Sequence, residues 1–148
     1  MIEFYLHGIQ VNITAEDLNF LFKDGKNDTK SRIKREIHVE AKFWDYKIPD
    51  RNFQQLSFVK SICQYFLHLY WKRSNKDGGH VDFTKELSNI DCELEKLIFT
   101  VRQKKNRYYL YICHQLGGKI LHELYLDGQE VTQLDIVIGK AINSISPL

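Results

Sequence analysis

The sequence predicts an α+β fold: an antiparallel sheet, built in the order strands, helix, strands, helix, with two main helices packed on one face. Three patterns predict this class. Residues 33–43 alternate apolar and polar side chains, short strand-like segments follow one another closely between 97 and 126, and two long segments carry apolar residues at helical spacing. Short gaps between strands favour antiparallel hairpins, and one-sided helices pack against such a sheet.

The chain fits a single α+β domain over residues 1–148. Its 148 residues are enough to bury a core without metal or disulfide links. The apolar share of 43% and the charged share of 27% are close to those of an average globular protein. The composition therefore excludes a chain that is disordered over most of its length.

The first predicted element is a short hairpin over residues 2–14, where apolar residues alternate on both sides of Gly8. Thr14 is placed to cap a short helix over 15–22. Residues 23–32 have the composition of a polar loop that contains a glycine.

Residues 33–43 form the clearest predicted strand. Odd positions are apolar except at Arg35, and even positions are polar. This period of two predicts one buried face and one solvated face. The predicted buried face consists of Ile33, Ile37, Val39, Ala41 and Phe43. The predicted solvated face includes His38, Glu40 and Lys42.

A long helix is predicted over residues 53–72, with Asp50 or Asn52 as its N-cap and Gly78-Gly79 beyond its end. Its apolar residues cover two adjacent faces, one with Leu56, Val59, Cys63, Phe66, Leu67 and Tyr70, the other with Phe58, Ile62, Tyr65 and Leu69. An apolar arc this wide indicates burial on more than one side, and it also fits a homodimer contact.

The second half repeats the order of strands and helix. Residues 80–96 are predicted to be irregular and are locally acidic. Strands are predicted over 97–103, 108–115 and 119–126. A polar turn at 104–107 and the pair Gly117-Gly118 join them as hairpins. A final helix is predicted over 130–145, with Glu130 near its start, where an acid complements the helix dipole.

Charge and cysteine usage limit the classes of partner and compartment. The formal charge of +2 is too balanced to predict bulk attraction to nucleic acid or to an anionic membrane. Cys63, Cys92 and Cys113 form no Cys-x-x-Cys pair and are expected as reduced thiols. The first residues lack a signal-peptide pattern, and the longest apolar tract is too short to cross a bilayer. We therefore expect a cytoplasmic protein with no membrane partner.

Motifs for catalysis, metals and cofactors are absent from the sequence. The glycine pairs lack the spacing of a phosphate-binding loop. His114 and His122 fall on adjacent predicted strands, but two ligands do not make a metal site. We therefore assign no catalytic residue, metal or cofactor. A metal-independent nuclease that uses His38, Glu40 and Lys42 remains a third hypothesis.

An acidic stretch offers a surface for a basic partner protein. The residues assigned to it are Asp82, Glu86, Asp91, Glu93 and Glu95. Lys85 and Lys96 offset part of the charge. Acidic groups beside apolar residues can steer and match a basic protein surface. A solvated loop is the alternative interpretation of the same pattern.

In kind, the chain resembles the small immunity proteins of bacterial toxin–immunity and contact-dependent inhibition systems. The resemblance rests on size, the missing motifs, the acidic loop at 82–95, and a strand at 120–128 that leads into the helix at 134–145. It implies a non-catalytic inhibitor that neutralises a cognate toxin domain by direct protein–protein binding, and this is the leading hypothesis.

A basic hairpin supports the second hypothesis, a single-stranded nucleic-acid-binding sheet protein. Its assigned residues are Arg102, Lys104, Lys105, Arg107, Tyr109 and Tyr111. Cations beside aromatic rings supply the phosphate neutralisation and base stacking that a single strand requires. Basic hairpin tips also prevent sheets from pairing edge to edge, which is the alternative explanation.

Overall fold

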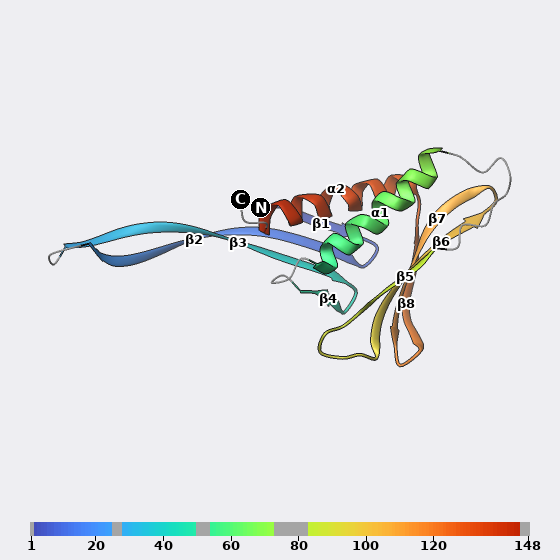
Figure 1. Cartoon of the computed structure of the whole chain (residues 1–148), viewed down its shortest axis with the longest axis horizontal. Coiled ribbons are helices and arrows are strands. Elements are labelled where there is room, and N and C mark those ends of the chain that lie inside the picture. Colours follow the sequence, from blue (N-terminus) through green and yellow to red (C-terminus); the bar gives the residue numbers. More distant parts are fainter. Residues whose placement is uncertain (1, 25–27, 50–53, 73–82, 146–148) are drawn as a thin grey trace.

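The computed structural model describes the backbone of residues 2–24, 28–49, 54–72 and 83–145, and the side chains of these residues outside 18–34 and 72. The described elements follow the order four strands, helix, four strands, helix (Figure 1). The α+β class is therefore confirmed. The strands form two antiparallel sheets of four strands each, where the sequence predicted one sheet.

The first sheet is an antiparallel meander in the order β1-β2-β3-β4. Its strands are β1 (Ile2–Leu6), β2 (Ile9–Asp24), β3 (Asp28–Phe43) and β4 (Tyr46–Ile48). The predicted hairpin around Gly8 is confirmed. The helix predicted over 15–22 and the loop predicted over 23–32 are wrong, because β2 and β3 stay paired from Ile9 and Phe43 out to Asp24 and Asp28. An isolated helix of eight residues is only marginally stable in water. In the hairpin, the N–H and C=O groups of alternate residues bond to the facing strand.

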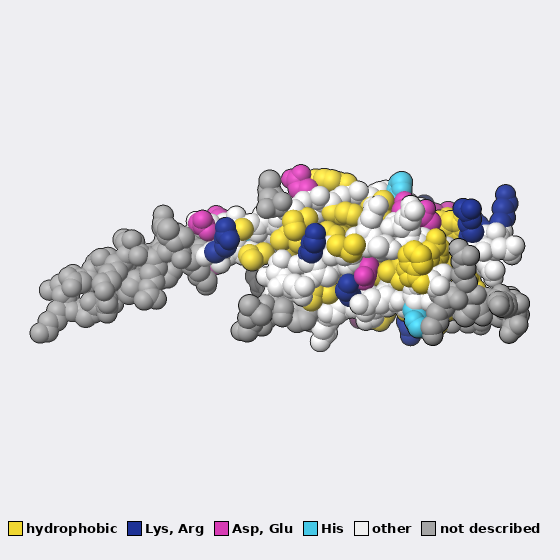
Figure 2. All heavy atoms as spheres, turned by 90° about the horizontal axis from the view of Figure 1, so that it is seen from above, with side chains coloured by type: hydrophobic (Ala, Val, Ile, Leu, Met, Phe, Trp, Pro, Cys, Tyr) yellow, Lys and Arg dark blue, Asp and Glu magenta, His cyan; other side chains and the backbone are white. Residues whose placement is uncertain are grey.

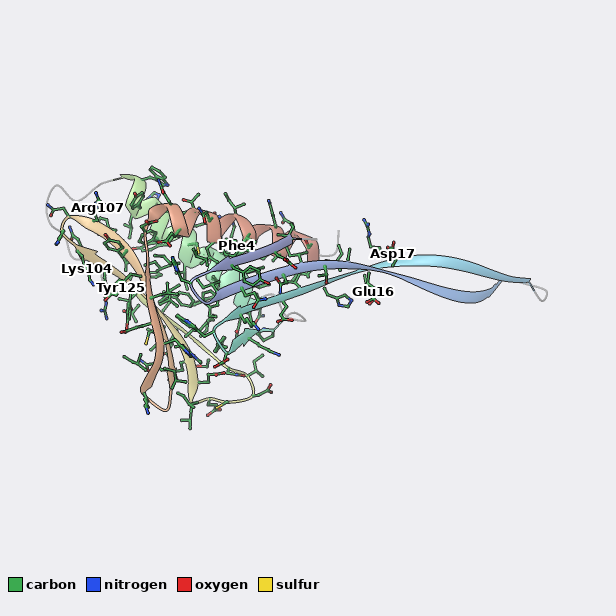
Figure 3. The ribbon with its side chains drawn as sticks, turned by 180° about the vertical axis from the view of Figure 1, so that it is seen from behind. Phe4, Glu16, Asp17, Lys104, Arg107 and Tyr125 are labelled. Carbon is green, nitrogen blue, oxygen red and sulfur yellow. The ribbon has the colours of Figure 1, made fainter. Side chains whose placement is uncertain are left out.

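The β2–β3 hairpin extends well beyond the helices (Figures 1 and 3). Near the body its inner face is buried, through Ile9, Val11, Ile13, Val39, Ala41 and Phe43. Burial ends at Val39, since Ile37 is 42% exposed, which corrects the predicted buried face. The side chain of Ile33 lies outside the described residues. On the other face His38 and Glu40 are exposed, as predicted, and Lys42 is half-buried.

Two long helices complete the core. They are α1 (Gln54–Lys72) and α2 (Gly128–Ile145), and both predicted helices are therefore confirmed within two residues. They pack against each other on one side of the first sheet (Figures 1 and 3). Their buried residues are Leu56, Val59, Ile62, Cys63 and Phe66 on α1, and Val131, Leu134, Val137, Ile138 and Ala141 on α2. The predicted N-caps Asp50 and Asn52 lie outside the described residues.

The start of α2 is a capping box. The backbone N–H of Glu130 donates to Asp127 Oδ1 at 2.9 Å, and the N–H of Asp127 donates to Glu130 Oε1 at 3.2 Å. His7 Nε2 lies 2.7 Å from Glu130 Oε2, so the β1–β2 turn also contacts this end of the helix. The reciprocal bonds satisfy donors that a helix start leaves unpaired.

The second sheet is a meander in the order β5-β6-β7-β8. Its strands are β5 (Thr84–Ser88), β6 (Glu95–Lys104), β7 (Arg107–Leu116) and β8 (Lys119–Leu126). The three predicted strands between 97 and 126 are confirmed. The prediction of irregular structure over 80–96 is wrong at β5, where Leu87 enters the core and pairs with Leu97. One apolar residue in β5 was too little alternation to detect the strand.

The two sheets share one hydrophobic core. The rings of Phe43 and Phe99 meet edge to face at 5.8 Å between centroids. Tyr46 donates its hydroxyl to Gln55 at 3.1 Å, and Gln55 donates to the carbonyl of Ser88 at 3.1 Å. These contacts link β4, α1 and β5. Neither of the helices in the described residues is long and apolar enough to cross a membrane.

Candidate functional site

The basic hairpin predicted from the sequence forms a distinct surface on the second sheet. We call it the cation–tyrosine face; its residues are Arg102, Lys104, Arg107, Tyr109, Tyr111 and Tyr125. The register pairs Arg102 with Tyr109, Lys104 with Arg107, and Tyr111 with Tyr125. Side chains alternate between sheet faces, so all six stand on the face opposite the core. Lys105 lies in the turn that joins the two strands.

Cations of this face lie over tyrosine rings. The guanidinium carbon of Arg102 is 3.9 Å from the ring centroid of Tyr111, and Arg102 Nη1 donates to the Tyr125 hydroxyl at 3.1 Å. Lys104 Nζ is 3.8 Å from the ring centroid of Tyr125. Attraction to the negative ring faces holds both cations in defined positions while they remain exposed to solvent.

The three tyrosines of the face differ in access. Tyr111 is buried, and its hydroxyl donates to Glu123. Burial, together with the hydrogen bond to Glu123, raises the pKa of Tyr111, so the hydroxyl remains a donor. Tyr109 is half-buried and meets Tyr125 edge to face at 6.3 Å. Among the described side chains, cations lie over the rings of Tyr111 and Tyr125 and none lies over the ring of Tyr109.

Sequence reasoning missed Tyr125. Tyr125 falls within the predicted strand 119–126, but only the observed register shows that it stands opposite Tyr111. Without that register its side of the sheet could not be assigned.

This end of the sheet carries uncompensated positive charge. Among the described side chains, no carboxylate lies within 4.0 Å of Arg102, Lys104, Lys105 or Arg107. Figure 2 shows Lys and Arg side chains at the end of the molecule that the β6–β7 hairpin forms, and Figure 3 shows Lys104 and Arg107 near its turn. The arrangement favours an anionic ligand.

The opposite end of the same sheet carries exposed aliphatic side chains. We call it the apolar tip; its residues are Ile90, Leu94, Leu116, Ile120 and Leu121. They come from the β5–β6 loop and from the ends of β7 and β8 on either side of the β7–β8 turn, which lie together at the end of the sheet away from the helices (Figure 1). The N–H of Gly117 donates to the carbonyl of Leu94 at 2.9 Å and joins the two segments.

The four predicted acidic residues that the structure describes fall into three groups. Asp91 and Glu93 are exposed in the β5–β6 loop beside Ile90 and Leu94. Glu86 lies 3.3 Å from Lys96, which offsets its charge. Glu95 points into the protein and contacts His114, and Asp82 lies outside the described residues. Asp91 and Glu93 are thus the acids best placed to meet a partner.

His114 and His122 lie on adjacent strands, as predicted, and the register, which the sequence left open, pairs the two residues across β7 and β8. Their Nδ1 atoms are 3.2 Å apart, and His114 Nε2 is 3.1 Å from Glu95 Oε2. Because Glu95 accepts from Nε2, a neutral His114 accepts at Nδ1 from His122. Trp44, in the β3–β4 turn, stacks on His122 at 5.2 Å and on His114 at 6.2 Å between ring centroids.

This cluster joins the two sheets. His114 is fully buried and both of its ring nitrogens have partners inside the protein. Glu95 also accepts from Asn89, so the cluster reaches the β5–β6 loop behind the apolar tip. Buried polar groups with complete hydrogen bonding rigidify a structure. The cluster therefore supports the loop that carries Ile90 and Leu94.

The groups considered for catalysis are dispersed. His38 lies on the exposed β2–β3 hairpin, 3.5 Å from Glu16 and 3.7 Å from Glu36. Burial, with the nearby Asp135 charge, raises the pKa of the Cys63 thiol, which disfavours the nucleophilic thiolate. Within residues 2–24, 28–49, 54–72 and 83–145, no group of three or more His, Cys, Asp or Glu side chains is arranged to hold a metal ion.

No protein-family model, no curated protein and no solved structure matches this chain.

Proposed function

We propose that the protein is a non-catalytic binding protein of the immunity type, which neutralises a cognate toxin domain by direct contact through the apolar tip. The observation that carries this proposal is the exposure of Ile90, Leu94 and Ile120, which is 68%, 64% and 50%. These three side chains project at one end of a sheet whose opposite end is strongly polar. Clustered exposed aliphatic side chains are typical of protein-binding surfaces.

The shape of the tip suits insertion into a partner. Ile120 pairs with Gln115 and the next pair is Leu116 with Lys119, so Ile120 and Leu116 point to opposite faces of the sheet. The tip is therefore apolar on both faces and resembles a wedge more than a flat patch. Complete burial of each large aliphatic side chain contributes roughly 1.5–3 kcal/mol, enough for a few such residues to dominate an interface.

Charge specifies the kind of partner. Asp91 and Glu93 stand beside the aliphatic residues in the same loop and are exposed. No cation lies within 4.0 Å of either carboxylate among the described side chains. Two free acids beside an apolar wedge complement a toxin cleft that is apolar at its centre and basic at its rim. Such complementarity speeds association and excludes acidic partners.

The test combines complex formation with neutralisation. An untagged candidate toxin domain, chosen from the adjacent genes, is co-expressed with the tagged wild type, with Leu94→Asp/Ile120→Asp, and with Ile136→Asp. Ile136 is the matched control, because it is 52% exposed on α2, away from the tip. We expect the wild type and Ile136→Asp to co-purify with the toxin and to protect cells. The double variant should weaken binding by at least about 30-fold, as loss of interface hot spots does.

Two results would contradict the proposal. One is the absence of any complex between the wild type and the toxin at micromolar concentration. The other is equal loss of protection in the double variant and in Ile136→Asp. Light scattering of the free protein adds a further check, since a stable homodimer that the tip substitutions dissociate would assign the tip to self-association.

A further inference from the structure

The cation–tyrosine face is a separate surface from the apolar tip. Both lie on the second sheet, and β6 runs from Glu95 near the tip to Lys104 near the basic turn. Nine residue steps at about 3.3 Å each place the two ends about 30 Å apart. A ligand on one end therefore leaves the other end accessible.

The face offers both kinds of contact that a single-stranded nucleic acid requires. Lys104, Lys105 and Arg107 are exposed cations without a neighbouring carboxylate among the described side chains. The guanidinium carbon of Arg102 lies 3.9 Å from the ring centroid of Tyr111, and the side chain is exposed, so a base can still reach and stack on the guanidinium group. Tyr109 supplies an aromatic ring beside it.

From this geometry we infer a second binding site, in which single-stranded nucleic acid lies across the cation–tyrosine face. Lys104 and Arg107 neutralise phosphates near the turn, and Arg102 and Tyr109 stack with bases further along the strands. A duplex hides the faces of its bases and can use only the cations. Preference for single strands therefore separates this site from a general polyanion surface.

The first experiment measures the salt dependence of binding. Fluorescence anisotropy follows a labelled single strand of about 12 nucleotides, of mixed sequence, titrated with wild type and with Lys104→Gln/Arg107→Gln at several salt concentrations. We expect the logarithm of the affinity to fall linearly with the logarithm of the salt concentration. Removing two phosphate contacts should lower the magnitude of this slope by about 1.4, or about 0.7 per contact.

The matched control is Lys47→Gln/Lys140→Gln, which removes the same charge from two exposed lysines on β4 and α2. We expect its slope and affinity to remain those of the wild type. Equal effects of the two double variants would overturn the inference, because the protein would then bind through its overall charge. Failure of the wild type to bind any single strand at about 50 mM salt would overturn it as well.

The second experiment tests stacking. Tyr109→Ala should weaken binding about tenfold or more, and Tyr109→Phe should retain the wild-type affinity because the ring is preserved. Equal affinity of Tyr109→Ala and the wild type, or equally tight binding of polyglutamate of matched charge, would contradict a single-strand site. The tip variant Leu94→Asp/Ile120→Asp serves as a further control and should bind the oligonucleotide normally. This independence allows either proposal to fail without the other.

Discussion

At the scale of single residues, His114 lies at the junction of the two sheets. His114 is fully buried between Trp44 and Tyr46, with His122 and Glu95 on its nitrogens. The chain has six histidines, and the sequence around His114 shows only that this residue falls on a predicted strand. Its importance follows from the residues that the fold places around it.

The first prediction concerns the stability of this junction. His114→Ala removes a buried ring and leaves Glu95 Oε2 without its partner, while Asn89 still donates to Oε1. We expect the free energy of unfolding to fall by roughly 2–4 kcal/mol in urea titrations. The control is His68→Ala, at an exposed position on α1, which should change stability by less than about 0.5 kcal/mol. Similar losses of unfolding free energy in the two variants would show that the cluster around His114 contributes little to stability.

The second prediction concerns alkaline pH and Tyr46. Burial raises the pKa of Tyr46 to about 12, and the nearby Glu95 charge adds to the effect. In the unfolded chain a tyrosine titrates near pH 10, so the unfolded state loses this proton first. The stability due to the neutral hydroxyl is therefore complete below about pH 10 and is lost as pH rises towards about 12.

The measurement compares the wild type with Tyr46→Phe, which cannot titrate at this position. Urea unfolding should show the wild type losing about 1.4 kcal/mol more per pH unit than the variant above about pH 10. At neutral pH the variant should be about 1 kcal/mol less stable, because Gln55 loses its donor. Parallel pH profiles would show that Tyr46 ionises as easily in the folded protein as in the unfolded chain.

At the scale of elements, two-residue turns set the strand registers. Lys105 and Asn106 have positive φ angles of 50° and 64°, and Gly117 and Gly118 have 59° and 82°. Two successive positive φ angles define the turn type that matches the twist of a β-hairpin. His7 and Gly8 have the same pattern, with 47° and 95°. These turns place the basic residues at one end of the second sheet and the apolar tip at the other.

The third prediction distinguishes two of these glycines. A Cβ atom at Gly8 would lie 2.4 Å from Trp44 Nε1, whereas one at Gly118 would meet nothing within 4 Å. Both glycines have positive φ angles, which disfavour any residue with a Cβ atom. Gly118→Ala should therefore lower the free energy of unfolding only by this conformational penalty, about 1 kcal/mol. Gly8→Ala should cost at least about 2 kcal/mol and change tryptophan fluorescence, because Trp44 must move from the histidine rings. Equal losses of unfolding free energy in the two variants would show that Trp44 moves aside without an energetic penalty.

Elements with a strong pattern of their own were predicted correctly, and weakly patterned ones were not. Both helices and the strands between 97 and 126 have regular apolar spacing and short turns. The segment 15–22 lacks a clear period of either kind, so its structure depends on the pairing of Ala15 with Ile37 and the pairs beyond it. Cross-strand pairing of this kind overrides local propensity.

At the scale of the whole molecule, the second sheet presents two surfaces of opposite character. The cation–tyrosine face and the apolar tip occupy opposite ends of β6 and β7 (Figures 1 and 3). The core beneath them is shared with the first sheet and both helices. Because the two surfaces lie at opposite ends of a shared rigid support, two ligands can bind without competing for space. The two proposed experiments test the two surfaces separately.

The sequence alone determined the α+β class, both helices and the basic hairpin, because periodicity and turn chemistry are local properties. Only the tertiary structure decided that the strands form two sheets, that Tyr125 joins the cation–tyrosine face, and that Glu95 turns inward. It also decided that aliphatic residues from two separate segments meet at one tip. These outcomes depend on register and on which surfaces the core leaves uncovered, and such contacts between distant residues leave no local pattern.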